Sequence, residues 1–161
     1  MKIAIYPGSY DPITNGHLDI IERSSSLFDT IIVAVARNAE KVPALFSESE
    51  RIAMINQSIF HLKNVEVDSF NGLLVNYVAE KNGNAIIRGL RALSDFEFEF
   101  KMALMNRSLK EEISTVFMMP HEQYTHISSS LIKEVASLGG DISTYVPQHV
   151  EHALKESYGG K

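Results

Sequence analysis

Residues 6–17 are the densest group of chemically useful residues in the sequence. They read YPGSYDPITNGH, a turn rich in Gly, Pro, Ser, Asp, Thr and Asn that follows an apolar run at residues 3–6. Apolar residues at helical spacing come next, so the turn joins a strand to a helix. Free N–H groups at a helix start bind anions, and His17 can add a hydrogen bond. The pattern indicates a phosphate site; the alternative is an ordinary connection with a surface histidine.

Two further groups could hold anions. Arg88 and Arg91 bracket Gly89 directly after an apolar run at residues 85–87. A guanidinium matches phosphate geometry, and glycine lets a ligand approach the backbone, although two solvated arginines are the plainer interpretation. Ser128–Ser130 stand at a predicted helix start, where one serine suffices as a cap and three could form a second anion cradle. Lys41, in a polar loop, is only weakly indicated.

This inventory consists of cations, hydroxyls and N–H donors, without an evident carboxylate pair, metal cluster or Ser-His-Asp arrangement. It suits phosphoryl or nucleotidyl transfer, in which catalysis is mostly positioning and electrostatic stabilisation. Neither GxGxxG nor GxxxxGK[ST] occurs in the sequence, so dinucleotide-binding and P-loop interpretations lose their main support.

Composition limits the protein class. The 161 residues predict one domain over 1–161, and 45% hydrophobic with 22% charged residues is typical of a globular protein. A net charge of −5 argues against a general nucleic-acid surface, and no apolar run approaches membrane-spanning length. The absence of cysteine fits a reducing compartment. We therefore expect a cytoplasmic protein with neither nucleic acid nor membrane as partner.

Strand-like runs alternate with helix-like segments along the chain. The runs lie at residues 3–6, 30–35, 65–67, 85–87 and 115–119. This alternation predicts an α/β fold, a doubly wound five-stranded parallel sheet, Rossmann-like, of order 3-2-1-4-5 with helices on both faces. The loops singled out above follow the first, fourth and fifth strands, so all three converge at the carboxyl ends of the sheet, where such folds bind ligands.

Helix boundaries follow from capping patterns. The first helix is expected to include Phe28, a capping box is expected at residues 47–50, and Ser94 with Glu97 is expected to cap a long helix. Pro147 is expected to be the first residue of the last helix. The long helix is apolar around more of its circumference than one sheet face can cover, which indicates a subunit interface or an internal helix.

Four segments, taken in order, resemble one family. They are residues 6–17, Arg88-Gly89-Leu90-Arg91-Ala92, residues 95–99 and residues 127–135. The first resembles the T/HxGH signature of the nucleotidyltransferase superfamily. Together they resemble the bacterial phosphopantetheine adenylyltransferases over nearly the whole chain.

The resemblance implies a magnesium-dependent reaction in coenzyme A biosynthesis: ATP and 4′-phosphopantetheine give dephospho-coenzyme A and pyrophosphate. The acceptor phosphate would attack the α-phosphorus in line, with His17 stabilising the developing charge and no covalent enzyme intermediate. The implied catalytic residues are His17, Ser9, Lys41 and Arg91. The implied phosphopantetheine ligands are Ser9, Lys41, Leu74 and Arg88. The implied ATP ligands are Ser9, Tyr10, His17, Gly89, Leu90, Arg91, Glu99, Tyr124, Thr125, His126, Ile127, Ser128, Ser129 and Ser130, with no protein ligand assigned to the metal. A homohexamer, built as a dimer of trimers, is also implied.

The chain departs from the family pattern at a few positions. Tyr10 replaces a usual phenylalanine, Thr125 and His126 replace Ser-Phe, and the loop with Lys41 is one residue longer than in many relatives. The Tyr10 hydroxyl is a candidate for altered packing around the adenine. Two alternatives stay open: another cytidylyl- or adenylyltransferase with a different phosphorylated acceptor, and a non-catalytic nucleotide-binding module.

Overall fold

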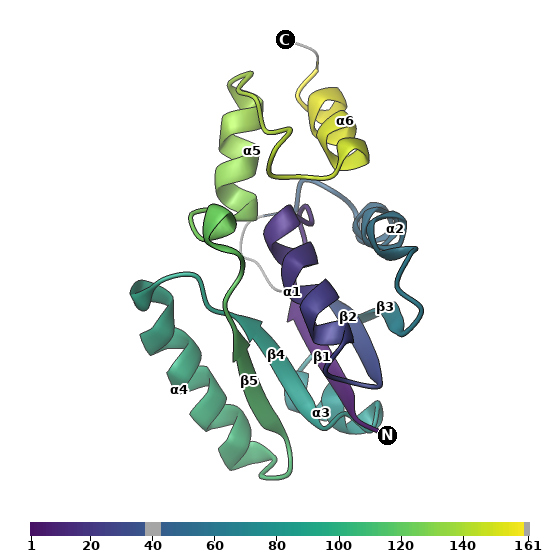
Figure 1. Ribbon diagram of the computed structural model, residues 1–161, viewed down its shortest axis with the longest axis vertical. Helices are drawn as coiled ribbons and strands as arrows, with labels where there is room; N and C mark the ends of the chain where they lie inside the picture. The colour runs from purple at the N-terminus through teal and green to yellow at the C-terminus, as the bar shows by residue number, and fades with distance from the viewer. Residues whose placement is uncertain (38–42, 160–161) are drawn as a thin grey trace.

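The computed structural model describes residues 1–37 and 43–159, so Lys41 lies outside the described residues (Figure 1). The strands are β1 (Ile3–Gly8), β2 (Thr30–Ala36), β3 (Val65–Phe70), β4 (Ala85–Gly89) and β5 (Ser114–Met118). The helices are α1 (Asn15–Ser25), α2 (Glu48–Ile59), α3 (Leu74–Glu80), α4 (Leu93–Leu109), the 3₁₀ turn η1 (Glu122–Tyr124), α5 (Ser129–Ser137) and α6 (Gln148–Ser157). None of the helices in this part of the chain is both long and apolar enough to cross a membrane.

The five strands form one parallel sheet in the order β3-β2-β1-β4-β5, which confirms the predicted topology. The central strand β1 pairs on both sides, with Ile5 opposite Ile32 of β2 and Ile86 of β4. The strand order reverses between β1 and β4, so the connections that follow these two neighbouring strands diverge and leave room for a ligand. In Figure 1 α5 and α6 extend beyond this carboxyl edge.

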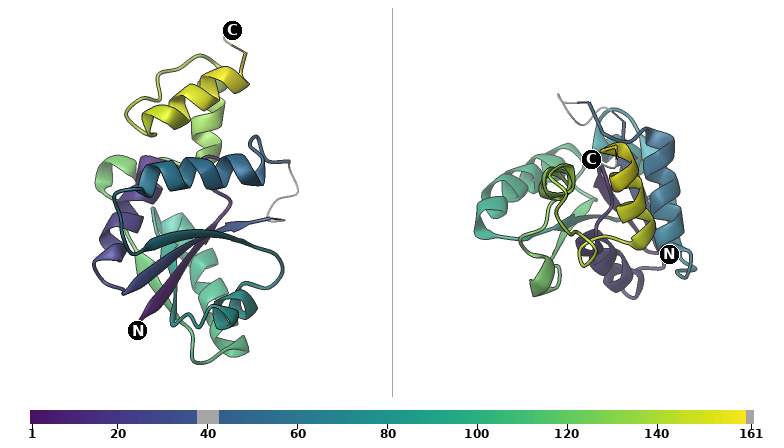
Figure 2. Two further views of the ribbon diagram at one scale, coloured as in Figure 1. Left: turned by 90° about the vertical axis from the view of Figure 1, so that its right-hand side faces the viewer. Right: turned by 90° about the horizontal axis from the view of Figure 1, so that it is seen from above.

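Helices cover both faces of the sheet, as predicted, because strand side chains alternate between two cores. Ala4 and Tyr6 of β1 pack in the larger core with residues of α1, α2, α5 and α6, while Ile5 packs in the smaller core with residues of α3. Figure 2 shows α2 and α3 on opposite sides of the sheet. The helix α4 lies along the edge strand β5 (Figure 1).

Several predicted boundaries are wrong. The helix α1 ends at Ser25, so Phe28 lies beyond it. The expected capping of α4 by Ser94 is also wrong: α4 begins at Leu93 with Ala92 as N-cap and no side-chain cap. The nearest side-chain bond at this helix start is a long one, from the N–H of Arg91 to the carboxylate of Asp95 at 3.4 Å. Pro147 is the N-cap of α6, one residue before the expected position.

Candidate active site

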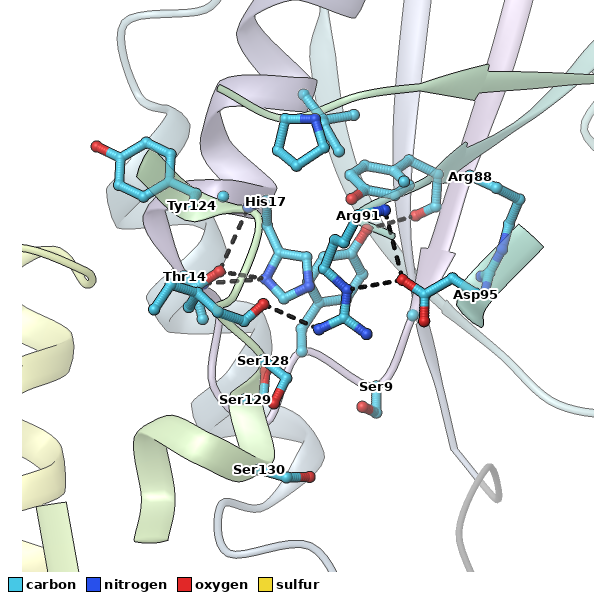
Figure 3. Close-up of a pocket in the computed structure, with 18 of the residues that line it drawn as sticks. Ser9, Thr14, His17, Arg88, Arg91, Asp95, Tyr124, Ser128, Ser129 and Ser130 are labelled. Carbon is cyan, nitrogen blue, oxygen red and sulfur yellow. Dashed lines mark hydrogen bonds and ion pairs between the residues drawn. The ribbon is translucent and has the colours of Figure 1, made fainter. Parts of the chain in front are cut away.

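A cavity of about 300 Å³ opens at the carboxyl ends of β1 and β4 (Figure 3). It combines the turn after β1, the start of α1, the end of β4, the start of α4 and the segment that enters α5. Twelve predicted site residues line it: Ser9, Tyr10, His17, Arg88, Gly89, Arg91, Glu99, Tyr124, Ile127, Ser128, Ser129 and Ser130. The sheet therefore brings three groups from distant parts of the sequence to one crevice.

Four other predicted residues do not line this cavity. Leu74 starts α3 and packs against the smaller core. The Leu90 N–H donates to the carbonyl of Met118, the Thr125 hydroxyl donates to the carbonyl of Glu122, and the ring of His126 lies edge-on to that of Tyr145. Thr125 and His126 can still contact a ligand through their backbone, because their neighbours Tyr124 and Ile127 line the cavity.

The orientation of His17 is fixed by the start of its own helix. The Thr14 side chain accepts the N–H of His17, and the Thr14 N–H donates to Nδ1 of His17 at 3.0 Å, which forms a reciprocal capping box. Because Nδ1 accepts this bond, it carries no proton, and the ring proton of the neutral imidazole is on Nε2. Capping therefore selects the tautomer that presents an N–H donor from Nε2.

Electrostatics keep this imidazole neutral. Burial, with the nearby positive charges of Arg91 and Arg88, lowers the pKa of His17 to about 4. At neutral pH the ring therefore acts as an uncharged donor. The ring centroids of Tyr10 and His17 lie 5.0 Å apart, and the Tyr10 hydroxyl donates to the carbonyl of Tyr6 at 2.8 Å. The Tyr10 hydroxyl is thus engaged inside the protein.

The carboxylate of Glu99 orients Arg88. Nε and Nη2 of Arg88 donate to the two carboxylate oxygens of Glu99 at 2.8 and 2.7 Å, and Nη1 donates to the carbonyl of Pro7. Glu99 is only 8% exposed. The bonds to Glu99 raise the pKa of Arg88. A bidentate pair fixes the plane of the guanidinium, so its remaining N–H groups have a defined direction.

Arg91 links the end of β4 to the segment before α5. Its Nη1 donates to the carbonyl of Ile127 at 2.9 Å, and its Nε lies 3.3 Å from the carboxylate of Asp95. In Figure 3 Arg91 lies beside His17. Two fixed cations thus share the cavity with a neutral donor, and this combination favours a ligand with several phosphate groups.

The three serines have different roles. Ser128 caps α5 by accepting the N–H of Leu131, and the Ser129 hydroxyl donates to the carbonyl of Pro12 at 2.7 Å. Ser130 lines the cavity without a cap bond. The structural role expected of one serine is thus confirmed for Ser128, and the bond from Ser129 joins α5 to the turn after β1.

Asp11 and Lys133 form an ion pair that no pattern in the sequence predicted. Asp11 is 1% exposed and accepts the N–H groups of Leu45 and Phe46, each at 2.9 Å, and Nζ of Lys133 at 2.8 Å. Burial alone would raise the pKa of Asp11, but these bonds outweigh it and hold that pKa below its usual range. The only signal in the sequence was the Asp-Pro step inside the turn.

The described residues include no group of three or more His, Cys, Asp or Glu side chains that could hold a metal ion. The three carboxylates that line the cavity, Asp11, Asp95 and Glu99, are each paired with a cation. These residues therefore do not form a ligand set for Mg²⁺.

Comparison with known proteins agrees with this geometry. The family model described as cytidylyltransferase-like matches residues 5–135. The phosphopantetheine adenylyltransferase of Desulfosudis oleivorans is 57% identical over 159 residues, covering 99% of this chain and 94% of the relative. That of Syntrophomonas wolfei is 56% identical over 156 residues, covering 97% and 96%. A putative nicotinate-nucleotide adenylyltransferase from Vibrio parahaemolyticus superposes with a TM-score of 0.69 at 22% identity, covering 96% and 99%, which shows the shared fold.

The chain belongs to the cytidylyltransferase-like family and is a nucleotidyltransferase. Within that class, its relatives at 52–57% identity over nearly the whole chain place it in the phosphopantetheine adenylyltransferase family.

Proposed function

We propose that this enzyme transfers AMP from ATP to 4′-phosphopantetheine and releases pyrophosphate, giving dephospho-coenzyme A. The observation that carries the proposal is the convergence of a neutral His17 donor with two oriented arginines in one cavity, in a chain 57% identical to a protein of that name. A phosphoanhydride bond forms between the acceptor phosphate and the α-phosphate as the bond to pyrophosphate breaks, so the site must hold many negative charges at once.

In the proposed mechanism an acceptor phosphate oxygen attacks the α-phosphorus, and the bond from that phosphorus to the bridging oxygen of pyrophosphate breaks. Nε2–H of His17 donates to an α-phosphate oxygen and stabilises its growing charge, and no proton needs to leave the ring. The acceptor is bound by Ser9, Arg88, Leu74 and Lys41. The outer phosphates of ATP are bound by Arg91, Ser129 and Ser130. The rest of the nucleotide site consists of Tyr10, Gly89, Leu90, Glu99 and residues 124–128.

Mg²⁺ enters this proposal with the nucleotide. Because the carboxylates of the cavity are paired with cations, we propose that the ion is bound by the phosphates of ATP and by water. Its contribution is to neutralise phosphate charge, and no step is assigned to a protein–metal bond.

We also propose a cytoplasmic oligomer, a hexamer built as a dimer of trimers. The support is the apolar surface of α4, which among the described residues includes the exposed side chains Phe96, Phe98, Phe100, Met102, Leu104, Met105 and Leu109. An apolar helix surface of this length is typical of a subunit interface.

Pyrophosphate release with Mg-ATP tests the function against a panel of acceptors: 4′-phosphopantetheine, nicotinamide mononucleotide and glycerol 3-phosphate, with CTP as the alternative donor. We expect turnover with ATP and 4′-phosphopantetheine alone. His17→Ala should abolish it, and His152→Ala, an exposed change on α6, should not. Reaction with another acceptor would show that the protein is a different nucleotidyltransferase with a different acceptor. Binding of ATP without turnover would indicate a non-catalytic nucleotide-binding module.

A further inference from the structure

Arg51 of α2 is a buried cation held by backbone carbonyl groups. Its side chain is 5% exposed, and none of the ion pairs among the described residues includes it. Nη1 donates to the carbonyl of Ser9 at 2.7 Å and to the carbonyl of Ala36 at 3.4 Å. The buried Nε has no hydrogen-bond partner in the part of the chain that the structure describes. Burying an unpaired cation is costly, so its position calls for a compensating role.

The carbonyl that Arg51 holds belongs to the peptide bond between Ser9 and Tyr10. In a trans peptide the C=O and N–H groups point in opposite directions, so the N–H of Tyr10 points away from Arg51. Ser9 and Tyr10 line the cavity and Arg51 does not, so we infer that this N–H faces the cavity. Among the described residues the Tyr10 N–H has no acceptor.

The backbone at Tyr10 is strained. Its φ is +50°, in the left-handed region that a tyrosine rarely adopts and that costs on the order of 1 kcal/mol. The bond from Tyr10 Oη to the carbonyl of Tyr6 and the bond from Arg51 to the carbonyl of Ser9 hold this conformation. These two bonds therefore hold the peptide between Ser9 and Tyr10 at the wall of the cavity.

We propose that Arg51 is a positioning residue that presents the Tyr10 N–H to a phosphate group of the bound nucleotide. The cation polarises the Ser9–Tyr10 peptide, so the N–H becomes a stronger donor. The partial positive charge that the phosphate meets at this N–H is therefore larger. This inference deepens the proposed function and rests on it for the identity of the ligand. It assigns Arg51 no direct contact with substrate.

The test uses two probes, inorganic tripolyphosphate and adenosine, with binding measured by calorimetry on the full chain. Arg51→Met should weaken tripolyphosphate binding about tenfold, the value of one hydrogen bond to a charged group, and leave adenosine binding unchanged. Arg51→Lys, which keeps a cation, should recover most of the tripolyphosphate affinity. Lys63→Met, which removes one exposed positive charge, is the matched control. Equal weakening of both probes would reduce Arg51 to a structural role and overturn the inference.

A second measurement needs no variant. The chain has six tyrosines, so selective ¹⁵N-tyrosine labelling of the wild-type enzyme lets the Tyr10 amide be followed. Its proton resonance should move downfield when tripolyphosphate binds. An unmoved Tyr10 resonance at saturation would overturn the inference even if Arg51→Met does not fold. Failure of the wild type to react with ATP and 4′-phosphopantetheine would contradict the proposed function and leave this contact measurable.

Discussion

Three neighbours set the tautomer and the charge of His17 for its proposed role. Thr14 selects the ring tautomer, and Arg91 with Arg88 discourages protonation. These residues surround a ring whose burial already favours the neutral form. The two arginines proposed to bind the anionic substrate therefore also help to keep the imidazole uncharged in the free enzyme.

This arrangement makes a prediction for the free and the bound enzyme. In ¹⁵N NMR spectra His17 should be the neutral Nε2–H tautomer at pH 6 and titrate near pH 4. Saturating tripolyphosphate should raise its pKa, because a nearby anion favours the charged ring. The His17→Gln spectrum identifies the resonance. A free-enzyme pKa at or above 6.5 would contradict the desolvated environment.

The same shift has a consequence for stability. The folded-state pKa of about 4 lies below the unfolded value of 6.5, so between these values the unfolded state binds more protons. The contribution of His17 is therefore complete above pH 6.5 and decreases as the pH falls toward 4. Urea unfolding of wild type and His17→Gln at pH 7 and pH 5 should show a larger decrease in the wild type. Equal decreases would exclude this linkage.

Glu99 offers a second test at this scale. Both of its carboxylate oxygens accept from Arg88, so Glu99→Gln should free that guanidinium and raise the KM for 4′-phosphopantetheine about tenfold, with the KM for ATP little changed. Glu97→Gln, on the exposed side of the same helix, is the control. A larger rise in the KM for ATP would instead support the direct nucleotide contact that the family resemblance implies.

At the scale of elements, Asp11 connects three parts of the structure: the turn after β1, the segment before α2 and the helix α5. We expect Asp11→Asn to lower the free energy of unfolding by about 3 kcal/mol, because Lys133 would lose its partner in a mostly buried site. Asp29→Asn, at an exposed carboxylate that accepts the N–H of Lys2, is the control. Urea unfolding measures both.

A double-mutant cycle measures the coupling free energy between Asp11 and Lys133. Asp11→Asn combined with Lys133→Met should cost less than the sum of the two single changes. The stabilisation should also decrease with acid: the pKa of Asp11 is lowered by folding, so its contribution is present above pH 3.8 and is lost as the pH falls below it. Additive single changes would mean that the ion pair is not energetically coupled.

These connections explain what could be predicted from the sequence and what could not. The strands were predictable because runs such as residues 30–35 are continuous and β-branched, and their alternation with helices determines the order. The convergence of His17, Arg88 and Arg91 followed from that order. The bonds of Asp11 join residues 34 to 122 positions apart, and no local pattern marks such a partner. The burial of Arg51 likewise depends on packing, since it stands in an ordinary helical sequence.

At the scale of the whole molecule, the helix α4 carries large apolar side chains that the single chain leaves exposed. Phe98→Asp together with Met105→Asp should dissociate the proposed assembly, because both side chains are more than half exposed in the single chain. Sedimentation equilibrium measures the mass. Phe60→Asp, a change of the same kind at an 84% exposed side chain on α2's C-cap, should leave the mass unchanged. A monomeric wild type would contradict the hexamer.

The bond from Ser129 to the carbonyl of Pro12 and the bond from Arg91 to the carbonyl of Ile127 complete the cavity from the last third of the chain. During translation, a nascent chain that has left the ribosome only as far as β5 has every strand of the sheet and the His17 turn, but neither of these connections. Ligand can stabilise a folded chain only after its site exists. ATP, the proposed substrate, can therefore stabilise the folded enzyme only after the segment through α5 has emerged.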